Sequence, residues 1–222
     1  SLRIYGASGD SVIISKSKIL AVVLCVWAAP SSWAQDANDL VVRLHSINKD
    51  SALKAEAITR GQERSMLCSY CHGKDGNSVK NYIPNLADQN PEYLLNQFQY
   101  FASGERKSYV MEQISKGLTA DEMVDLAIFY ASESVKPQAG IESSEAGKTR
   151  YQSFCFACHG DDGKGNKDLP RLAGQKKAFL MKALKDFKHG KAARANSPMV
   201  RIMKAVKTSD IEPLADYIAT MQ

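Results

Sequence analysis

The sequence predicts an all-α protein built from two tandem helical domains that are related by an internal repeat. Three observations support this prediction. The chain of 222 residues carries the pentapeptide Cys-x-x-Cys-His twice, and the segments that follow the two copies can be aligned with each other. Apolar residues recur at helical spacing in both copies. No segment of any length shows the alternation of apolar and polar residues that is typical of a half-buried β-strand.

The first 34 residues are expected to lie outside the two domains. Lys16 and Lys18 precede an apolar run over residues 19–29, and small residues lead to a cleavage site after Ala34. This order is typical of a secretory signal peptide. The run has about eleven residues, whereas a bilayer span needs about 20, so a permanent anchor is less favoured. A lipoprotein cut before Cys25 is disfavoured by the bulky residue that precedes it.

Composition places the rest of the chain among ordinary globular proteins. Hydrophobic residues make up 44% of the sequence and charged residues 24%, which excludes a disordered or collagen-like chain. Of the five cysteines, Cys25 would leave with the signal peptide and the other four lie in the repeated motifs. An exported protein could form disulfides, but no cysteine remains for a separate disulfide framework.

The repeat sets the expected domain boundaries at residues 35–136 and 137–222. Cys68 of the first copy aligns with Cys155 of the second, and the alignment continues to the end of the chain with a drift of one residue in the loops. Residues 134–140 contain the proline and glycine of a linker between the copies.

Helices of the first domain are expected at residues 55–67, 92–101 and 121–130. The second and third of these place apolar side chains at helical spacing. Thr119 precedes the third helix and Glu122 follows three residues later, the pattern of a capping box.

In the second domain, helices are expected at residues 146–154 and 211–221, and Thr208 or Ser209 would cap the latter. Each domain has about 85 residues, a size at which a hydrophobic core alone is marginal. A large buried cofactor would supply the missing core.

The repeated motif predicts covalent haem c. Two cysteines three residues apart present both thiols on one side of a helical turn, where they reach the two vinyl groups of a haem and form thioethers. The histidine that follows is then an axial ligand of the iron, and Cys-x-x-Cys-His is the attachment signature of c-type haem. The residues concerned are Cys68, Cys71 and His72 in the first copy and Cys155, Cys158 and His159 in the second.

Two other readings of the motif are weaker. A thioredoxin-like redox pair is expected in a βαβ context, which is absent, and it explains neither the histidine nor the duplication. A zinc site would bring the two cysteine pairs together, but zinc sites separate such pairs by about 12–20 residues, and Cys71 and Cys155 are much further apart.

The sixth iron ligand decides between an electron carrier and an enzyme. Met111 lies 39 residues after His72, Met199 lies 40 after His159, and the two methionines align in the repeat. Thioether ligation raises the potential of haem iron, and two closed His/Met centres leave no position for a substrate. Met203 is the rival ligand in the second copy. His45 and His189 are expected at the surface, so ligation by two histidines is the minority alternative.

Pro84 and Pro170 begin the repeated pattern Pro-x-Leu-Ala-x-Gln about a dozen residues after each histidine. A proline lacks the N–H group, and its carbonyl is free to accept a hydrogen bond from the Nδ1–H of the axial histidine. Such a bond fixes the orientation of the ring. The alternative is an ordinary loop proline, but the repetition favours the specific role.

These features together resemble the dihaem cytochrome c4 family, whose members consist of two class I cytochrome c domains. The resemblance covers about residues 55–222. The residues that carry it in the first copy are Cys68 to Gly76, Pro84 to Gln89, Tyr93 to Leu95, Phe101 to Arg106 and Met111. Their matches in the second copy are Cys155 to Gly163, Pro170 to Gln175, Phe179 and Leu180, His189 and Gly190, and Met199.

The resemblance implies two all-α haem domains that carry single electrons in the periplasm, often towards a terminal oxidase. Residues 36–54 depart from the family pattern and could pack on a partner or on the first domain. A runner-up function is the cytochrome subunit of a periplasmic dehydrogenase with a flavoprotein-type partner. A dihaem peroxidase is less favoured, because it would need an open iron position.

Charge is divided unequally between the predicted domains. Residues 35–136 hold 11 Lys and Arg against 14 Asp and Glu, a net charge of −3, whereas residues 137–222 hold 15 against 9, a net charge of +6. Eight lysines between residues 164 and 191 concentrate this excess. A basic face steers association with an acidic redox partner, whereas a nucleic-acid role is not expected for an exported haem protein.

Overall fold

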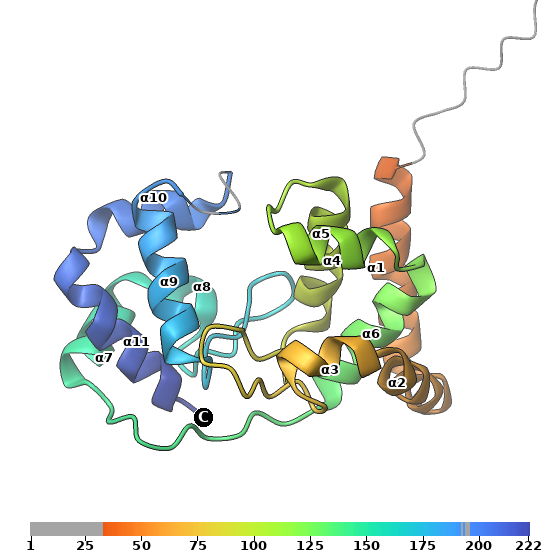
Figure 1. The fold of residues 1–222 in the computed structure, drawn as a ribbon, viewed down its shortest axis with the longest axis horizontal. Helices are drawn as coiled ribbons and strands as arrows, with labels where there is room; N and C mark the ends of the chain where they lie inside the picture. The colour runs from red at the N-terminus through yellow and green to blue at the C-terminus, as the bar shows by residue number, and fades with distance from the viewer. Residues whose placement is uncertain (1–32, 192, 194–195) are drawn as a thin grey trace, which may run out of the picture. The chain divides into compact units, whose positions relative to one another are not determined.

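The computed structural model describes residues 33–191, 193 and 196–222, and its regular structure is helical (Figure 1). The predicted all-α class is confirmed. Among the described residues, the one strand-like feature is an isolated bridge between Asn166 and Leu169.

Residues 34–222 form one compact unit. The predicted signal peptide falls outside the described residues except for its last two positions. No helix within the described ranges combines the length and apolar character needed to cross a bilayer.

The first half of the unit contains six helices among the described residues. These are α1 (Trp33–Lys49), α2 (Ser51–Arg64), α3 (Met66–His72), α4 (Pro91–Ser103), α5 (Tyr109–Lys116) and α6 (Ala120–Ser132). The segment 55–67, expected as one helix, belongs to two helices that meet at Ser65. Asp50 caps α2, because its side chain accepts from the N–H groups of Ala52 and Leu53.

Within the described residues, the second half repeats this order without a counterpart of α1. Its elements are α7 (Glu145–Phe154), α8 (Phe156–His159), α9 (Lys177–Lys188), α10 (Pro198–Ala205), the 3₁₀ turn η2 (Thr208–Asp210) and α11 (Ile211–Thr220). The predicted linker 134–140 lies in the non-helical segment between α6 and α7.

The predicted capping box at the start of α6 is confirmed, since Thr119 accepts from the N–H of Glu122 and Glu122 accepts from the N–H of Thr119. The predicted cap of α11 by Thr208 or Ser209 is wrong. Both residues lie in η2, which runs directly into α11, so backbone bonds of the 3₁₀ turn replace a side-chain cap at its first N–H groups.

In each half a glycine lies where the helix that precedes the Cys-x-x-Cys-His motif crosses the last helix of that half. In the first half α2 packs on α6, and a Cβ atom on Gly61 would lie 2.3 Å from the carbonyl oxygen of Asp125. In the second half α7 packs on α11, and a Cβ on Gly147 would lie 1.9 Å from the carbonyl oxygen of Pro213. Only glycine permits so close an approach of the two helices.

Each half has its own cluster of buried hydrophobic side chains. Helix α1 closes the cluster of the first half with Leu44, which is 1% exposed, and with Ile47. An ion pair from Arg43 to Asp121 of α6 and a contact of 2.9 Å from Nε2 of His45 to the carboxylate of Glu92 of α4 tie the helix to the first half. Of the two alternatives for residues 36–54, the structure shows packing on the first half.

Candidate haem sites

The first Cys-x-x-Cys-His motif lies in α3. Cys68 and Cys71 are three residues apart in the helix and share one side of it. His72 is the last residue of α3 and is buried. Gly73 follows with φ of 81°, and a Cβ at this position would lie 2.2 Å from the carbonyl oxygen of Asn77. The glycine therefore lets the chain turn away directly after the histidine.

The ring of His72 is oriented by the carbonyl group of Pro84, whose oxygen lies 2.9 Å from Nδ1. Because a carbonyl oxygen only accepts hydrogen bonds, Nδ1 carries the proton and Nε2 keeps its lone pair. Burial lowers the pKa of His72, and the bond to Pro84 opposes this shift only in part. The ring is therefore neutral at neutral pH, and the hydrogen bond predicted from the sequence is present.

The second motif holds its histidine in the same way. Cys155 directly precedes α8, which contains Cys158 and His159. Nδ1 of His159 lies 3.0 Å from the carbonyl oxygen of Pro170, and burial lowers the pKa of the ring. The hydroxyl of Tyr151 donates to the carbonyl of Gly160 at 2.7 Å and ties α7 to the end of the motif.

The two predicted methionine ligands lie in the first turn of α5 and of α10, and in each case a serine side chain accepts from the N–H of the methionine. Met111 and Cys68 pack against the cluster of the first half, and Met199 and Cys155 against that of the second. Met203 is 1% exposed and belongs to the buried core itself.

The residues present fit a haem in each half. None of the four motif cysteines forms a disulfide, so each sulfur is available for a thioether bond to haem. Burial raises the pKa of Cys68 and raises that of Cys155 to about 11, so both are protonated at neutral pH. Several large apolar side chains close in sequence to the motifs and the methionines are exposed; they include Leu67, Tyr70, Tyr109, Val110 and Phe156.

The other candidate ligands lie elsewhere. His45 is engaged with Glu92 through Nε2 at 2.9 Å, and His189 is exposed at the end of α9. In the described part of the chain, no three His, Cys, Asp or Glu side chains gather in a way that could hold a metal ion.

Two buried glutamines were missed by sequence reasoning. Gln89 and Gln175 end the two copies of Pro-x-Leu-Ala-x-Gln, and each bonds the backbone of the other half, at Arg171 and Asn85 respectively. The repetition of the glutamine is visible in the sequence, but the residue it contacts depends on which loops of the two halves meet.

Two helical halves, each with a Cys-x-x-Cys-His helix end and a proline-bound histidine, define a dihaem c-type cytochrome. A family model described as cytochrome c matches residues 144–222. Cytochrome c4 of Azotobacter vinelandii is 33% identical over 184 residues, which cover 71% of this chain and 86% of that protein. The chain belongs to the cytochrome c4 family.

Further comparisons agree with this assignment. The crystal structure of reduced recombinant cytochrome c4 from Pseudomonas stutzeri matches with a TM-score of 0.63 and 28% identity, covering 73% of this chain and 97% of that one. A thiosulfate dehydrogenase electron acceptor of Thiomonas intermedia is 29% identical over 204 residues, 84% of this chain and 81% of that protein. Membership in the family makes covalently bound haem c the cofactor and electron transfer the role of this protein.

Proposed function

We propose that this protein is a periplasmic carrier of single electrons in which each half holds one haem c with both axial positions of the iron filled. Cys68 and Cys71 would bind the first haem, with His72 and Met111 as iron ligands. Cys155 and Cys158 would bind the second haem, with His159 and Met199 as iron ligands. When bound, each haem supplies a one-electron ferric/ferrous couple.

One observation carries this proposal: the matching hydrogen bonds from His72 to Pro84 and from His159 to Pro170. Each bond leaves the Nε2 lone pair of a neutral ring available and restrains the plane of the ring. The matching methionines would close the opposite position, which argues against a peroxidase. The secretory pattern of residues 1–34 supports export to the periplasm.

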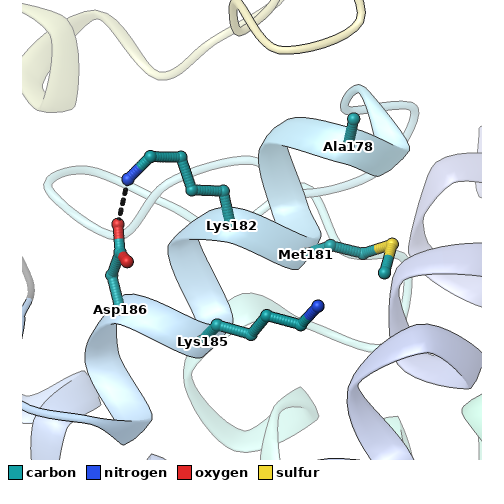
Figure 2. A pocket seen from close by; sticks show the side chains of 5 residues that line it. All are labelled: Ala178, Met181, Lys182, Lys185 and Asp186. Carbon is teal, nitrogen blue, oxygen red and sulfur yellow. Dashed lines mark hydrogen bonds and ion pairs between the residues drawn. The ribbon is translucent and has the colours of Figure 1, made fainter.

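We infer that the basic second half docks an acidic redox partner at α9. A shallow hollow of about 360 Å³ lies on this helix and is lined by Ala178, Met181, Lys182, Lys185 and Asp186 (Figure 2). Met181 and Lys185 extend to the same side of the helix, so an apolar surface lies beside a cation. Lys182 is paired with Asp186, whereas Lys185 forms no ion pair within the described residues.

The corresponding face of α4 supports a docking role for this hollow. In the repeat, Leu95 of α4 matches Met181 and Glu92 matches Ala178. Leu95 is 0% exposed, and Glu92 is paired with His45 of α1. Because the second half has no counterpart of α1 among the described residues, the matching face of α9 is left open to a partner.

Two classes of partner are supported. The resemblance to cytochromes c4 favours passage of electrons towards a terminal oxidase. The likeness to a thiosulfate dehydrogenase electron acceptor favours a periplasmic dehydrogenase as the donor. Stable co-purification with a larger catalytic subunit would favour the second role, that of a dehydrogenase subunit.

Stopped-flow kinetics test the proposal with purified thiosulfate dehydrogenase plus thiosulfate as the donor and membranes that contain a haem–copper oxidase as the acceptor. We expect Lys182→Glu/Lys185→Glu to lower the second-order rate constant about tenfold at low ionic strength, with the loss shrinking as salt is added. The control Lys148→Glu/Lys207→Glu changes the same charge elsewhere on the second half and should lower the rate constant less than about twofold.

An unchanged salt dependence in the Lys182/Lys185 variant would refute docking at α9. Failure of the wild-type protein to exchange electrons with either partner would refute the proposed carrier role towards these two classes.

A further inference from the structure

Gln89 and Gln175 form a reciprocal clamp between the two halves. Oε1 of Gln175 accepts from the N–H of Asn85 at 2.7 Å, and its Nε2 donates to the carbonyl of Asn85 at 3.0 Å. Oε1 of Gln89 accepts from the N–H of Arg171 at 2.7 Å, and its Nε2 donates to the carbonyl of Arg171 at 2.9 Å. The two glutamines occupy matching positions of the repeat, and so do the residues they bond.

The peptide groups that the glutamines contact are the same ones that orient the histidines. The peptide between Pro84 and Asn85 presents its carbonyl to Nδ1 of His72 and its N–H to Gln175. The peptide between Pro170 and Arg171 likewise lies between His159 and Gln89. Each histidine is thus connected to a glutamine of the other half through one planar peptide group.

Such a connection transmits polarisation. An acceptor on the N–H of a peptide group shifts electron density to its carbonyl oxygen through the resonance of the amide. The more negative oxygen strengthens the hydrogen bond from Nδ1–H and makes the imidazole a stronger donor ligand. Gln89, Gln175, Asn85 and Arg171 are all buried, so water does not screen this effect.

We propose that Gln175 tunes the reduction potential of the haem bound by His72 and that Gln89 tunes that of the haem bound by His159. Each half then partly sets the potential of the haem in the other half. A stronger imidazole donor favours ferric iron and lowers the potential, so loss of the glutamine raises it. The inference rests on the proposed axial roles of the two histidines, and both glutamines act as positioning residues.

The test uses Gln175→Leu and Gln89→Leu in the full-length protein with both haems attached. Leucine fills a similar space without accepting from the peptide N–H. In Gln175→Leu, we expect the ferrous-to-ferric ratio of the first-half haem, measured at a fixed applied potential, to rise about threefold. A tenfold change in this ratio corresponds to a shift of about 59 mV in the reduction potential for one electron. In Gln89→Leu the second-half haem should show this change. Redox titrations followed by NMR of the haem methyl groups separate the two haems.

A second readout follows the hydrogen bond itself. In the ferrous protein, the Nδ1–H proton of His72 should move upfield in Gln175→Leu, and that of His159 should move upfield in Gln89→Leu. In each variant, the Nδ1–H proton of the histidine in the same half as the replaced glutamine should shift less: that of His159 in Gln175→Leu and that of His72 in Gln89→Leu. A purely structural role of the glutamines would not produce this crossed pattern.

Asn90→Ala is the matched control. Nδ2 of Asn90 donates across the same contact to the carbonyls of Lys164 at 2.9 Å and Leu169 at 2.7 Å, without touching either histidine-bound peptide group. This variant loosens the contact between the halves and should not produce the crossed shifts.

The proposal is overturned by equal shifts of both haems, by a shift confined to the glutamine's own half, by the crossed pattern in Asn90→Ala, or by no shift. Haem content and the weak Met-to-iron absorption band, recorded on the same samples, show separately whether the axial ligands are as proposed. Failure of the coupling is therefore distinguishable from failure of the haem assignment.

Discussion

Met199 and Met203 lie one turn apart in α10, yet their surroundings differ. Met203 is enclosed in the core of the second half, and the matching residue of the first half, Ser115, is also fully buried and carries no thioether. Position 203 is therefore a packing position. Met199 is only partly buried, matches Met111 and packs against the same cluster as Cys155, which suits a ligand of iron.

Replacement of the ligand should open one haem. We predict that Met199→Ala produces about one carbon-monoxide-binding haem per chain and removes about half of the Met-to-iron band, because thioether ligation closes the sixth position. Optical titration of the ferrous protein measures both quantities. Met203→Leu, which conserves volume in the core, should bind no carbon monoxide; the opposite result for the two variants would make Met203 the ligand.

Local sequence was sufficient to predict the bonds from His72 and His159 to the two prolines, since motif, spacing and repetition all lie within a dozen residues of each histidine. It was not sufficient for Gln89 and Gln175. Their partners lie 82 and 90 residues away in the chain, and only the packing of the two halves brings them together.

At the scale of elements, the close crossing of α7 and α11 depends on Gly147, just as that of α2 and α6 depends on Gly61. Helical periodicity identifies the apolar stripes of these helices, but it does not give the distance between their axes. For this reason the role of the two glycines could not be predicted from a single sequence.

Gly147→Ala should separate α7 from α11, because the added methyl group would overlap the carbonyl of Pro213. We expect a loss of about 1–3 kcal/mol in the free energy of unfolding of the second half, the usual cost of overpacking. Urea titration of the haem-loaded protein, followed at the absorption of the haem, measures it. Gly117→Ala serves as the control, since its Cβ would meet nothing closer than 3.5 Å; equal midpoints for the two variants would contradict the packing account.

Helix positions were predicted best where the periodic segment is long. The helices expected at 92–101 and 121–130 correspond to α4 and α6 with small changes at their ends. Helices α5 and α10 have eight residues each, too few for periodicity to define. The break at Ser65 was missed, because it separates two helical segments without a proline or a glycine at the junction.

For the whole molecule, the repeat combines a shared interior with different surfaces. The motifs, the proline bonds and the crossing glycines occur in both halves. In the described part of the chain, α1 belongs to the first half and has no counterpart in the second. The net charge is −3 in the first half (11 basic against 14 acidic residues) and +6 in the second (15 against 9). Composition reveals the charge difference at once. It does not reveal that α1 packs on the core of the first half, because an amphipathic segment can pack in its own chain or on a partner.

The central claim is that each half holds one haem c closed by a histidine and a methionine. The measurement that tests it most directly is the visible spectrum of the purified oxidised and reduced protein, with a pyridine haemochrome assay and addition of carbon monoxide. We predict two haems per chain, an intact Met-to-iron band and no carbon monoxide binding. One haem per chain, or a high-spin haem that binds carbon monoxide, would contradict the account.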